Sequence, residues 1–88
     1  ELAPLLNEEE KINSNLSGRI CADQITPYPP GIPVLVPGQI ISQEIIQYII
    51  SMLRSQKHVE IHGIVYDGYL PCLRLLTVME EKNLIKLN

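Results

Sequence analysis

A proline-rich but apolar segment, residues 26–39 (TPYPPGIPVLVPGQ), constrains the fold of this chain more than any other feature. Each of its five prolines holds φ near −65° and lacks an N–H donor, and the residue before each proline favours an extended conformation. Too few donors remain for a central strand, which must pair on both edges. We therefore expect a stiff, extended strap that lies on an apolar surface, either the chain's own helix or a domain outside this sequence.

The length and composition of the chain limit what else it can be. Its 88 residues suit one domain, residues 1–88, with a small core of its own. The net charge of −3 provides no basic field for nucleic acid, and no apolar run approaches the ~18 residues of a membrane span. The N-terminus lacks the pattern of a signal peptide, and Cys21 and Cys72 are too few for a small secreted scaffold. We expect reduced, buried thiols and a cytoplasmic location.

Residues 41–56 (ISQEIIQYIISMLRSQ) carry the clearest helical pattern. Ser42 is a suitable N-cap, and Glu44 places a negative charge in the first turn, where it opposes the helix dipole. The apolar residues recur with a period of 3.6, which predicts one buried face made of Ile45, Ile46, Ile49, Ile50 and Leu53.

The remaining segments predict a small α+β domain. Residues 6–16 favour a short polar helix, and residues 57–68 alternate as a half-buried strand that ends in a turn. Residues 70–79 predict a second strand, with Pro71 at its start or on an edge, and residues 80–88 a charged, frayed tail. The expected architecture is a single domain with an extended proline-rich strap, one main amphipathic helix and a small sheet of two or three strands.

The stretch GRICADQITPYPPGIPVLVPGQIIS (residues 18–42) resembles the C-terminal domain of the PLP-dependent, fold-type-I ornithine/lysine/arginine decarboxylase family. The order of the later helix and strands is similar as well, so the core of the resemblance spans residues 14–79. Two positions depart from the family pattern, because Asp23 and Gln39 both stand where the family usually has Glu. The motif residues are Arg19, Tyr28, Pro29, Pro30, Gly31, Ile32, Pro33, Pro37, Gly38 and Gln39.

The resemblance implies a fragment of an enzyme that acts on arginine, lysine or ornithine and contributes to polyamine biosynthesis or acid resistance. In that family the PLP machinery belongs to a larger upstream domain, and no lysine here stands in a Ser-x-His-Lys context. We therefore expect no catalytic, cofactor-binding or metal-binding residue in this chain, and PLP only in the parent's catalytic domain. That domain is the expected partner, and the parent is expected to be a homo-oligomer. The alternative is a stand-alone, non-catalytic interaction module derived from this domain.

The motif residues are expected to contact the catalytic domain. For Arg19 two roles remain open: a clamp on a carboxylate or carbonyl within the domain, or a contact with another domain or the substrate. Tyr28 is expected to be a packed anchor, with a position at the rim of the active site as the alternative. Gln39 removes a carboxylate, so any ion pair that the family forms there is in doubt.

Other patterns lead to different functions. His58, Glu60 and His62 form H-x-E-x-H, which could hold a metal on a helix; on a strand the two histidines lie ~13 Å apart, too far to share an ion. An independent enzyme could use either histidine, and Glu60 with Asp67 could form an acid/base pair, although no spacing supports this pair. NLSGRICADQI is similar to a stretch of the molybdopterin molybdenumtransferases, but that similarity ends before the prolines. The PxxP spacing is typical of ligands of proline-binding domains, yet flanking basic residues are absent.

Overall fold

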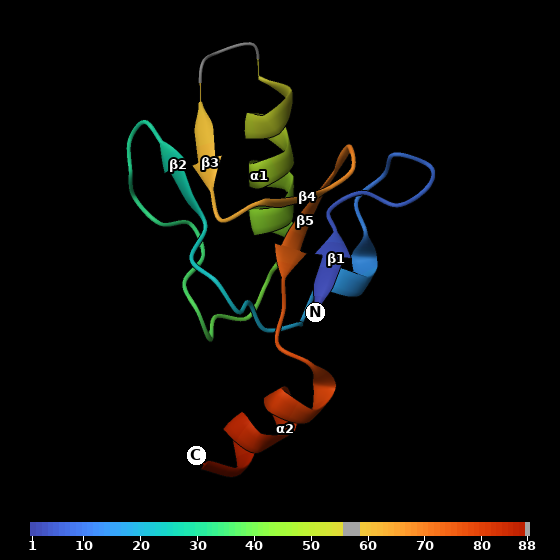
Figure 1. Ribbon diagram of the computed structural model, residues 1–88, viewed down its shortest axis with the longest axis vertical. Coiled ribbons are helices and arrows are strands. Elements are labelled where there is room, and N and C mark those ends of the chain that lie inside the picture. Colours follow the sequence, from blue (N-terminus) through green and yellow to red (C-terminus); the bar gives the residue numbers. More distant parts are fainter. Residues whose placement is uncertain (56–58, 88) are drawn as a thin grey trace.

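The computed structural model shows two small antiparallel sheets beside one long helix, and it describes residues 1–55 and 59–87 (Figure 1). The first sheet has the strand order β1-β5-β4, and the second pairs β2 with β3. This arrangement confirms the α+β class. The elements along the chain are β1 (Leu2–Pro4), the 3-10 helix η1 (Ser14–Leu16), β2 (Thr26–Tyr28), α1 (Gln43–Arg54), β3 (Glu60–His62), β4 (Val65–Asp67), β5 (Leu70–Arg74) and α2 (Val78–Leu87).

Helix α1 follows the prediction closely. The hydroxyl of Ser42 accepts a hydrogen bond from the backbone N–H of Ile45 at 3.2 Å, as expected of an N-cap. Ile46, Ile49 and Ile50 are buried along one face, and the helix ends at Arg54. The 3.6-residue apolar period is a local signal, which is why it predicts this element well.

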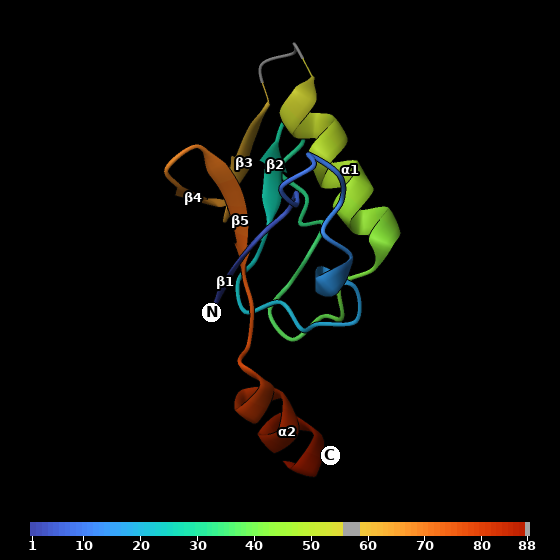
Figure 2. The same cartoon turned by 90° about the vertical axis from the view of Figure 1, so that its right-hand side faces the viewer.

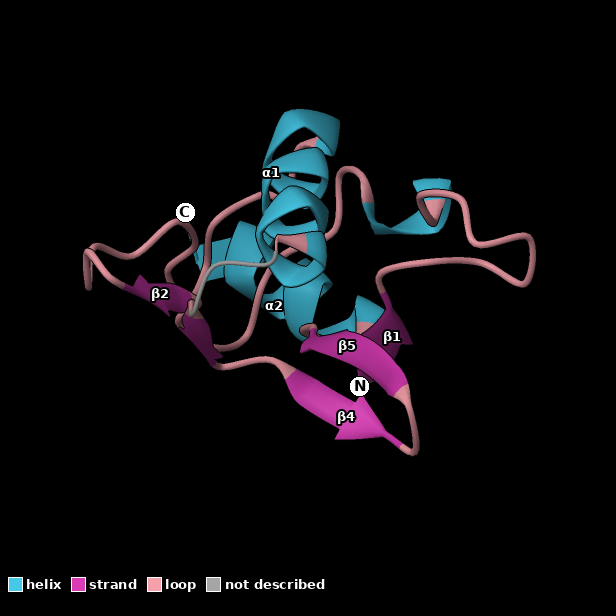
Figure 3. Ribbon diagram, turned by 90° about the horizontal axis from the view of Figure 1, so that it is seen from above, coloured by secondary structure: helices cyan, strands magenta, loops and turns pink. Residues whose placement is uncertain are grey.

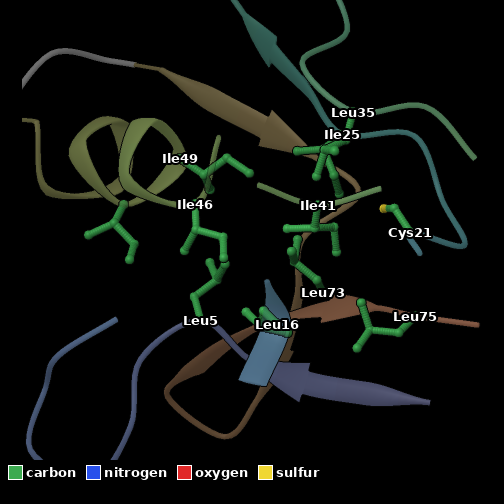
Figure 4. Close-up of a cluster of buried hydrophobic side chains, with 11 residues drawn as sticks. Leu5, Leu16, Cys21, Ile25, Leu35, Ile41, Ile46, Ile49, Leu73 and Leu75 are labelled. Atoms are coloured by element: carbon green, nitrogen blue, oxygen red, sulfur yellow. The ribbon is translucent and has the colours of Figure 1, made fainter. Parts of the chain in front are cut away.

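The core lies between α1 and the two sheets and draws on most of the chain (Figure 4). β1 leads directly into buried Leu5, β5 contributes Leu73, and the proline strap contributes Leu35, so distant segments meet here. A small domain needs such shared burial, because no single element has enough apolar surface to form a core alone. The central cluster consists of Leu5, Leu16, Cys21, Ile25, Leu35, Ile41, Ile46, Ile49, Ile50, Leu73 and Leu75.

The single strand predicted over residues 57–68 is instead two short strands in different sheets. β3 pairs with β2, and β4 pairs with β5. Between them Gly63 adopts φ +102°, and a Cβ at this position would lie 2.1 Å from the carbonyl oxygen of Gln24. The chain therefore bends where only glycine fits, and the alternating pattern continues past the bend because both strands have one half-buried face.

The helix predicted over residues 6–16 is wrong apart from the 3-10 turn η1. The side-chain oxygen of Asn7 accepts hydrogen bonds from the backbone N–H groups of Glu9 and Lys11, at 2.9 and 3.0 Å. These bonds close a loop, and Leu6 and Ile12 then form a bridge across it. An Asn side chain that satisfies local N–H groups competes with helix formation, which explains the difference. β1 was not anticipated either.

The C-terminal predictions also change. β5 is shorter than the strand predicted over residues 70–79, and it is the central strand of its sheet. The prediction that Pro71 could lie on an edge strand is therefore wrong. Pro71 lies near the start of β5, and its carbonyl accepts a hydrogen bond from the backbone N–H of Leu5 at 3.0 Å. The tail over residues 80–88 is largely helix α2, with residue 88 outside the described part. Thr77 and Glu80 exchange side-chain-to-backbone hydrogen bonds of 3.2 and 2.9 Å, a capping box that the T-x-x-E spacing signals in the sequence. In the described part, no helix is both long and apolar enough to cross a bilayer.

Candidate functional site

The strap (residues 26–39) begins as an edge strand. Its first three residues form β2, which pairs only with β3, so the expectation that it is not a central strand is confirmed. Pro27 is fully buried, and its carbonyl accepts from Gly31 N–H at 2.7 Å. Gly31 has φ +86°, and a Cβ there would lie 2.9 Å from the ring of Tyr28. The Tyr28 ring therefore rests on the glycine and fixes the turn of the motif.

The strap then folds back onto its own domain. Ile25 N–H donates to the Leu35 carbonyl, and Val34 N–H donates to the Ile25 carbonyl, both at 2.9 Å. Leu35 is fully buried in the core cluster. The middle of the strap thus covers the domain's own core, which is the first of the two surfaces that we expected.

A second turn closes the strap through Gln39. The backbone N–H of Gln39 donates to the Val36 carbonyl at 3.1 Å, and its side-chain oxygen accepts from Val36 N–H at 3.1 Å. Gly38 supplies the positive φ of +89° that this turn requires. The residue that replaces the family's usual Glu therefore has an acceptor role inside the turn, which a carboxylate oxygen could also perform.

Four large apolar side chains remain exposed along and just beyond the strap, and we call them the strap face. Tyr28 is 46 % exposed, Ile32 65 %, Val36 43 % and Ile40 64 %. Residues 24–43 contain no charged side chain at all. An exposed apolar surface without charges is typical of the centre of a protein interface.

Other motif residues are exposed along the same segment. Four prolines of the strap are exposed as well, and they add no polar side chain to the segment. Tyr28 packs edge-on against His62, with ring centroids 4.6 Å apart, which holds one end of the face on β3. That these residues contact another domain stays a prediction. The exposed prolines are Pro29, Pro30, Pro33 and Pro37.

Arg19 is engaged within the domain. Its Nε donates to Glu81 Oε1 at 2.9 Å and its Nη2 donates to the Leu76 carbonyl at 2.8 Å; Nη2 also contacts the carboxylate of Glu1. Glu81 Oε1 accepts from Ile20 N–H as well, at 3.1 Å, and the hydrogen bond from Arg19 lowers the pKa of this carboxyl. These contacts match the carboxylate-and-carbonyl clamp, and they fasten the first turn of α2 to the domain.

The described members of the acidic and histidine pattern, Glu60, His62 and Asp67, do not converge on a site. His58 lies outside the described residues. Glu60 and His62 belong to β3, as the strand interpretation requires, and their exposed side chains form an ion pair of 3.4 Å when the histidine is protonated. Asp67 lies in β4, in the other sheet, so it is not paired with Glu60. The part of the chain that the structure describes holds no group of three or more potential metal ligands.

The described lysines do not fit the needs of PLP. An open groove of about 700 Å³ separates α1 from the loop around Glu10, and Lys11 lines it. The Lys11 side chain is 76 % exposed and lies 3.7 Å from a carboxylate oxygen of Glu9, while Lys82 is exposed on α2. A Schiff-base lysine needs a shielded pocket with a phosphate site, and neither side chain has one. No step of a PLP reaction can be assigned to these residues.

Comparisons with known proteins agree with the motif. Residues 5–73 match the family described as Orn/Lys/Arg decarboxylase, C-terminal domain. An arginine decarboxylase of Bacillus subtilis is 54 % identical over 37 residues, which cover 42 % of this chain and 8 % of that protein. The constitutive lysine decarboxylase of Escherichia coli is 33 % identical over 60 residues, which cover 59 % of this chain and 8 % of the relative. A solved structure of the constitutive lysine decarboxylase of E. coli matches with a TM-score of 0.65 and 27 % identity, over 88 % of this chain and 11 % of that one. The chain thus spans between 8 % and 11 % of the length of these proteins.

Proposed function

The chain belongs to the Orn/Lys/Arg decarboxylase C-terminal domain family, and from that premise we propose that it is the closing domain of a PLP-dependent decarboxylase of basic amino acids. In this proposal the strap face packs on the catalytic domain, and the chain has no catalytic group of its own. The parent enzyme is a cytoplasmic homo-oligomer whose substrate is arginine, lysine or ornithine. PLP would be held by the catalytic domain, where it would supply the electron sink for decarboxylation.

The strap face is the observation that supports this proposal most directly. Ile32 and Ile40 are each about two-thirds exposed, although the segment between them enters the core through Leu35. A segment that only covered its own core would normally carry polar or charged side chains on its outer side, whereas residues 24–43 contain no charged residue. Because prolines restrict the segment before any contact forms, docking of the strap face costs little conformational entropy.

Amide hydrogen exchange compares the isolated 88-residue chain with the full-length decarboxylase. We expect the amides of Tyr28, Ile32 and Val36 to exchange more slowly in the full-length enzyme, because the catalytic domain excludes water from them. Equal protection in both proteins would show that the strap covers only its own domain.

A substitution in the full-length enzyme tests the same surface by function. Ile32→Asp adds a charge at a 65 % exposed position, so it disturbs docking but not the core. We expect this variant to lose decarboxylase activity or to release the C-terminal domain to proteolysis. Tyr69→Asp is the matched control, because Tyr69 is fully exposed at the β4–β5 turn. If both variants behave like the parent, the strap face is not the docking surface.

The isolated chain tests the absence of catalysis. After addition of PLP and borohydride, we expect only scattered modification of surface lysines and no release of carbon dioxide from a basic amino acid. Stoichiometric trapping at one lysine together with decarboxylation would contradict the proposal. A gene product that contains this domain alone would instead favour the stand-alone interaction module.

A further inference from the structure

The outer face of the three-stranded sheet is a second apolar surface, separate from the strap face. Ala3 and Leu73 lie directly opposite each other in the β1–β5 pair and point into the core. Since side chains alternate along a strand, the neighbouring positions point outward. Figure 2 shows α1 on the inner side of β4 and β5, and among the described residues no helix covers the outer side.

A row of small and apolar side chains crosses this outer face. Pro4, Cys72 and Val65 are aligned across β1, β5 and β4, outside the central core cluster; Cys72 is buried, at 3 % exposure, and Pro4 and Val65 are half-buried. Leu2 and Leu70 extend the row on either side and are 47 % and 50 % exposed. A sheet with one wetted face normally carries polar residues there, so this face resembles a covered one. We call these five residues the outer sheet face.

A positive and a negative side chain lie at the two ends of the outer sheet face. Arg74 is opposite Leu2 at one end, and Asp67 is opposite Leu70 at the other. Arg74 is 53 % exposed in its side chain, and its Nε lies 3.4 Å from a carboxylate oxygen of Asp23. Its other guanidinium nitrogens can therefore serve a second carboxylate. The arrangement places a positive end and a negative end about 13 Å apart along β5.

We propose that the outer sheet face binds the same face of a second copy of this chain, related by a twofold axis. The axis runs across the strands at the level of Cys72, midway between the two stacked sheets. β5 of one copy then lies antiparallel over β5 of the other, at the spacing of about 10 Å that stacked sheets adopt. Figure 3 shows β4 and β5 on the outside of the molecule, where a second copy has free approach.

The twofold axis pairs the charges as well as the apolar residues. It brings Arg74 of each copy to the level of Asp67 in the other, so two identical ion pairs form at the two ends. It also brings Leu2 of one copy toward Leu70 of the other, on both sides of the central row. The same face of a second copy thus supplies both the apolar contacts and the opposite charges. An unrelated partner would need its own apolar patch and its own charges at the same two positions.

The proposed dimer is weak, because Leu2 and Leu70 are the only well-exposed members of the outer sheet face, and with one ion pair per copy they form a face smaller than a standard interface. We expect half-association at about 10⁻⁴ M. Sedimentation equilibrium of the 88-residue chain between roughly 10⁻⁵ and 10⁻³ M covers this range. A chain that stays monomeric throughout overturns the proposal.

Substitutions then locate the interface. Leu70→Asp is expected to raise the dimer dissociation constant at least tenfold, whereas Ile32→Asp on the strap face is expected to leave it within twofold. The reverse pattern would show that the copies meet through the strap face, and it would refute the proposal. Circular dichroism and the urea midpoint confirm that each variant remains folded.

A charge reversal tests the symmetry itself. Arg74→Glu and Asp67→Lys are each expected to weaken the dimer, because each places like charges together, and the double variant is expected to restore it. Asp23→Asn is the control for the pair within the chain, and the dimer should survive it. If the double variant is as weak as the two single variants, the twofold arrangement is wrong.

Discussion

Gly63→Ala is expected to destabilise the domain more than any other glycine substitution, because two separate penalties coincide at this bend. At φ +102°, a residue with a Cβ carries backbone strain of about 1–3 kcal/mol. The new Cβ would also lie 2.1 Å from the Gln24 carbonyl oxygen and 2.8 Å from Ile25 Cδ1. The carbonyl belongs to the backbone and cannot move away by a change of rotamer. The total should therefore exceed about 3 kcal/mol.

This loss is large for a domain of 88 residues. Its whole free energy of unfolding is expected to be roughly 4–13 kcal/mol, from the usual range per residue. Gly63→Ala should therefore bring the domain close to its unfolding limit at 37 °C. The remaining structure is expected to lose the β2–β3 pair first, because Gly63 directly follows β3 and lies against the residues that precede β2.

Gly68→Ala provides the matched control. Gly68 also has a positive φ, +64°, but no heavy atom lies within 4 Å of a Cβ built there. Only backbone strain of about 1–2 kcal/mol is then expected. Urea unfolding, followed by circular dichroism and extrapolated to water, measures both variants against the parent chain. Equal losses in the two variants would refute the reasoning, since it assigns the difference to the clash with Gln24.

Three further predictions concern the strap and α2. Leu35→Ala should lower the free energy of unfolding, measured in urea, by about 2–5 kcal/mol. Val36→Ala, at a 43 % exposed position, should lower it by under about 1 kcal/mol. Similar losses in the two variants would mean that the strap is not divided into a buried and an exposed side. Thr77→Ala should weaken α2 locally by about 1 kcal/mol and lower the helical signal at 222 nm while the core stays intact, and Thr77→Ser should retain the signal. Glu81 has a lowered pKa because Arg19 donates to it, so its contribution to stability is present above the ordinary pKa of a glutamate and is lost as pH falls through the lower folded value. Glu81→Gln should remove this acid-sensitive part of the urea midpoint between pH 6 and 2, and an unchanged profile would contradict it.

Local patterns predicted some elements well, and tertiary contacts decided the others. α1 follows from its apolar period and its N-cap, which depend on neighbours within the helix. The bend at Gly63 could not be read from alternation, because the pattern continues across it and only the Gln24 carbonyl reveals why the chain turns. The start of α2 was predictable, since the T-x-x-E spacing that begins at Thr77 is a known capping signal.

In the candidate site, too, local patterns predicted some features and tertiary contacts decided the others. The prolines predict a stiff strap, but which residues it exposes depends on the bridge between Ile25 and Leu35, which lie ten positions apart. Arg19 could be recognised in the motif, yet its partner Glu81 stands far along the chain in a segment that seemed to be a frayed tail. Pattern reasoning identifies the residue types at such a site, and the fold decides which of them meet.

The pairing of β1 with β5 has a consequence for how the domain is made. Residues 2–4 cannot complete their sheet until residues 72–74 have been synthesised, because β5 is the strand that joins β1 to β4 (Figure 1). Closing so long a loop costs roughly 1.5–2 kcal/mol more than closing a ten-residue hairpin, and of the strand pairs in the described residues only β4–β5 is joined by a short turn. A ribosome that stalls before residue 70 therefore leaves Leu5, Leu16 and the inner face of α1 without their partner strand. Such a chain exposes apolar surface to chaperones and proteases, so premature termination before residue 70 should yield aggregation or degradation rather than a partly useful domain.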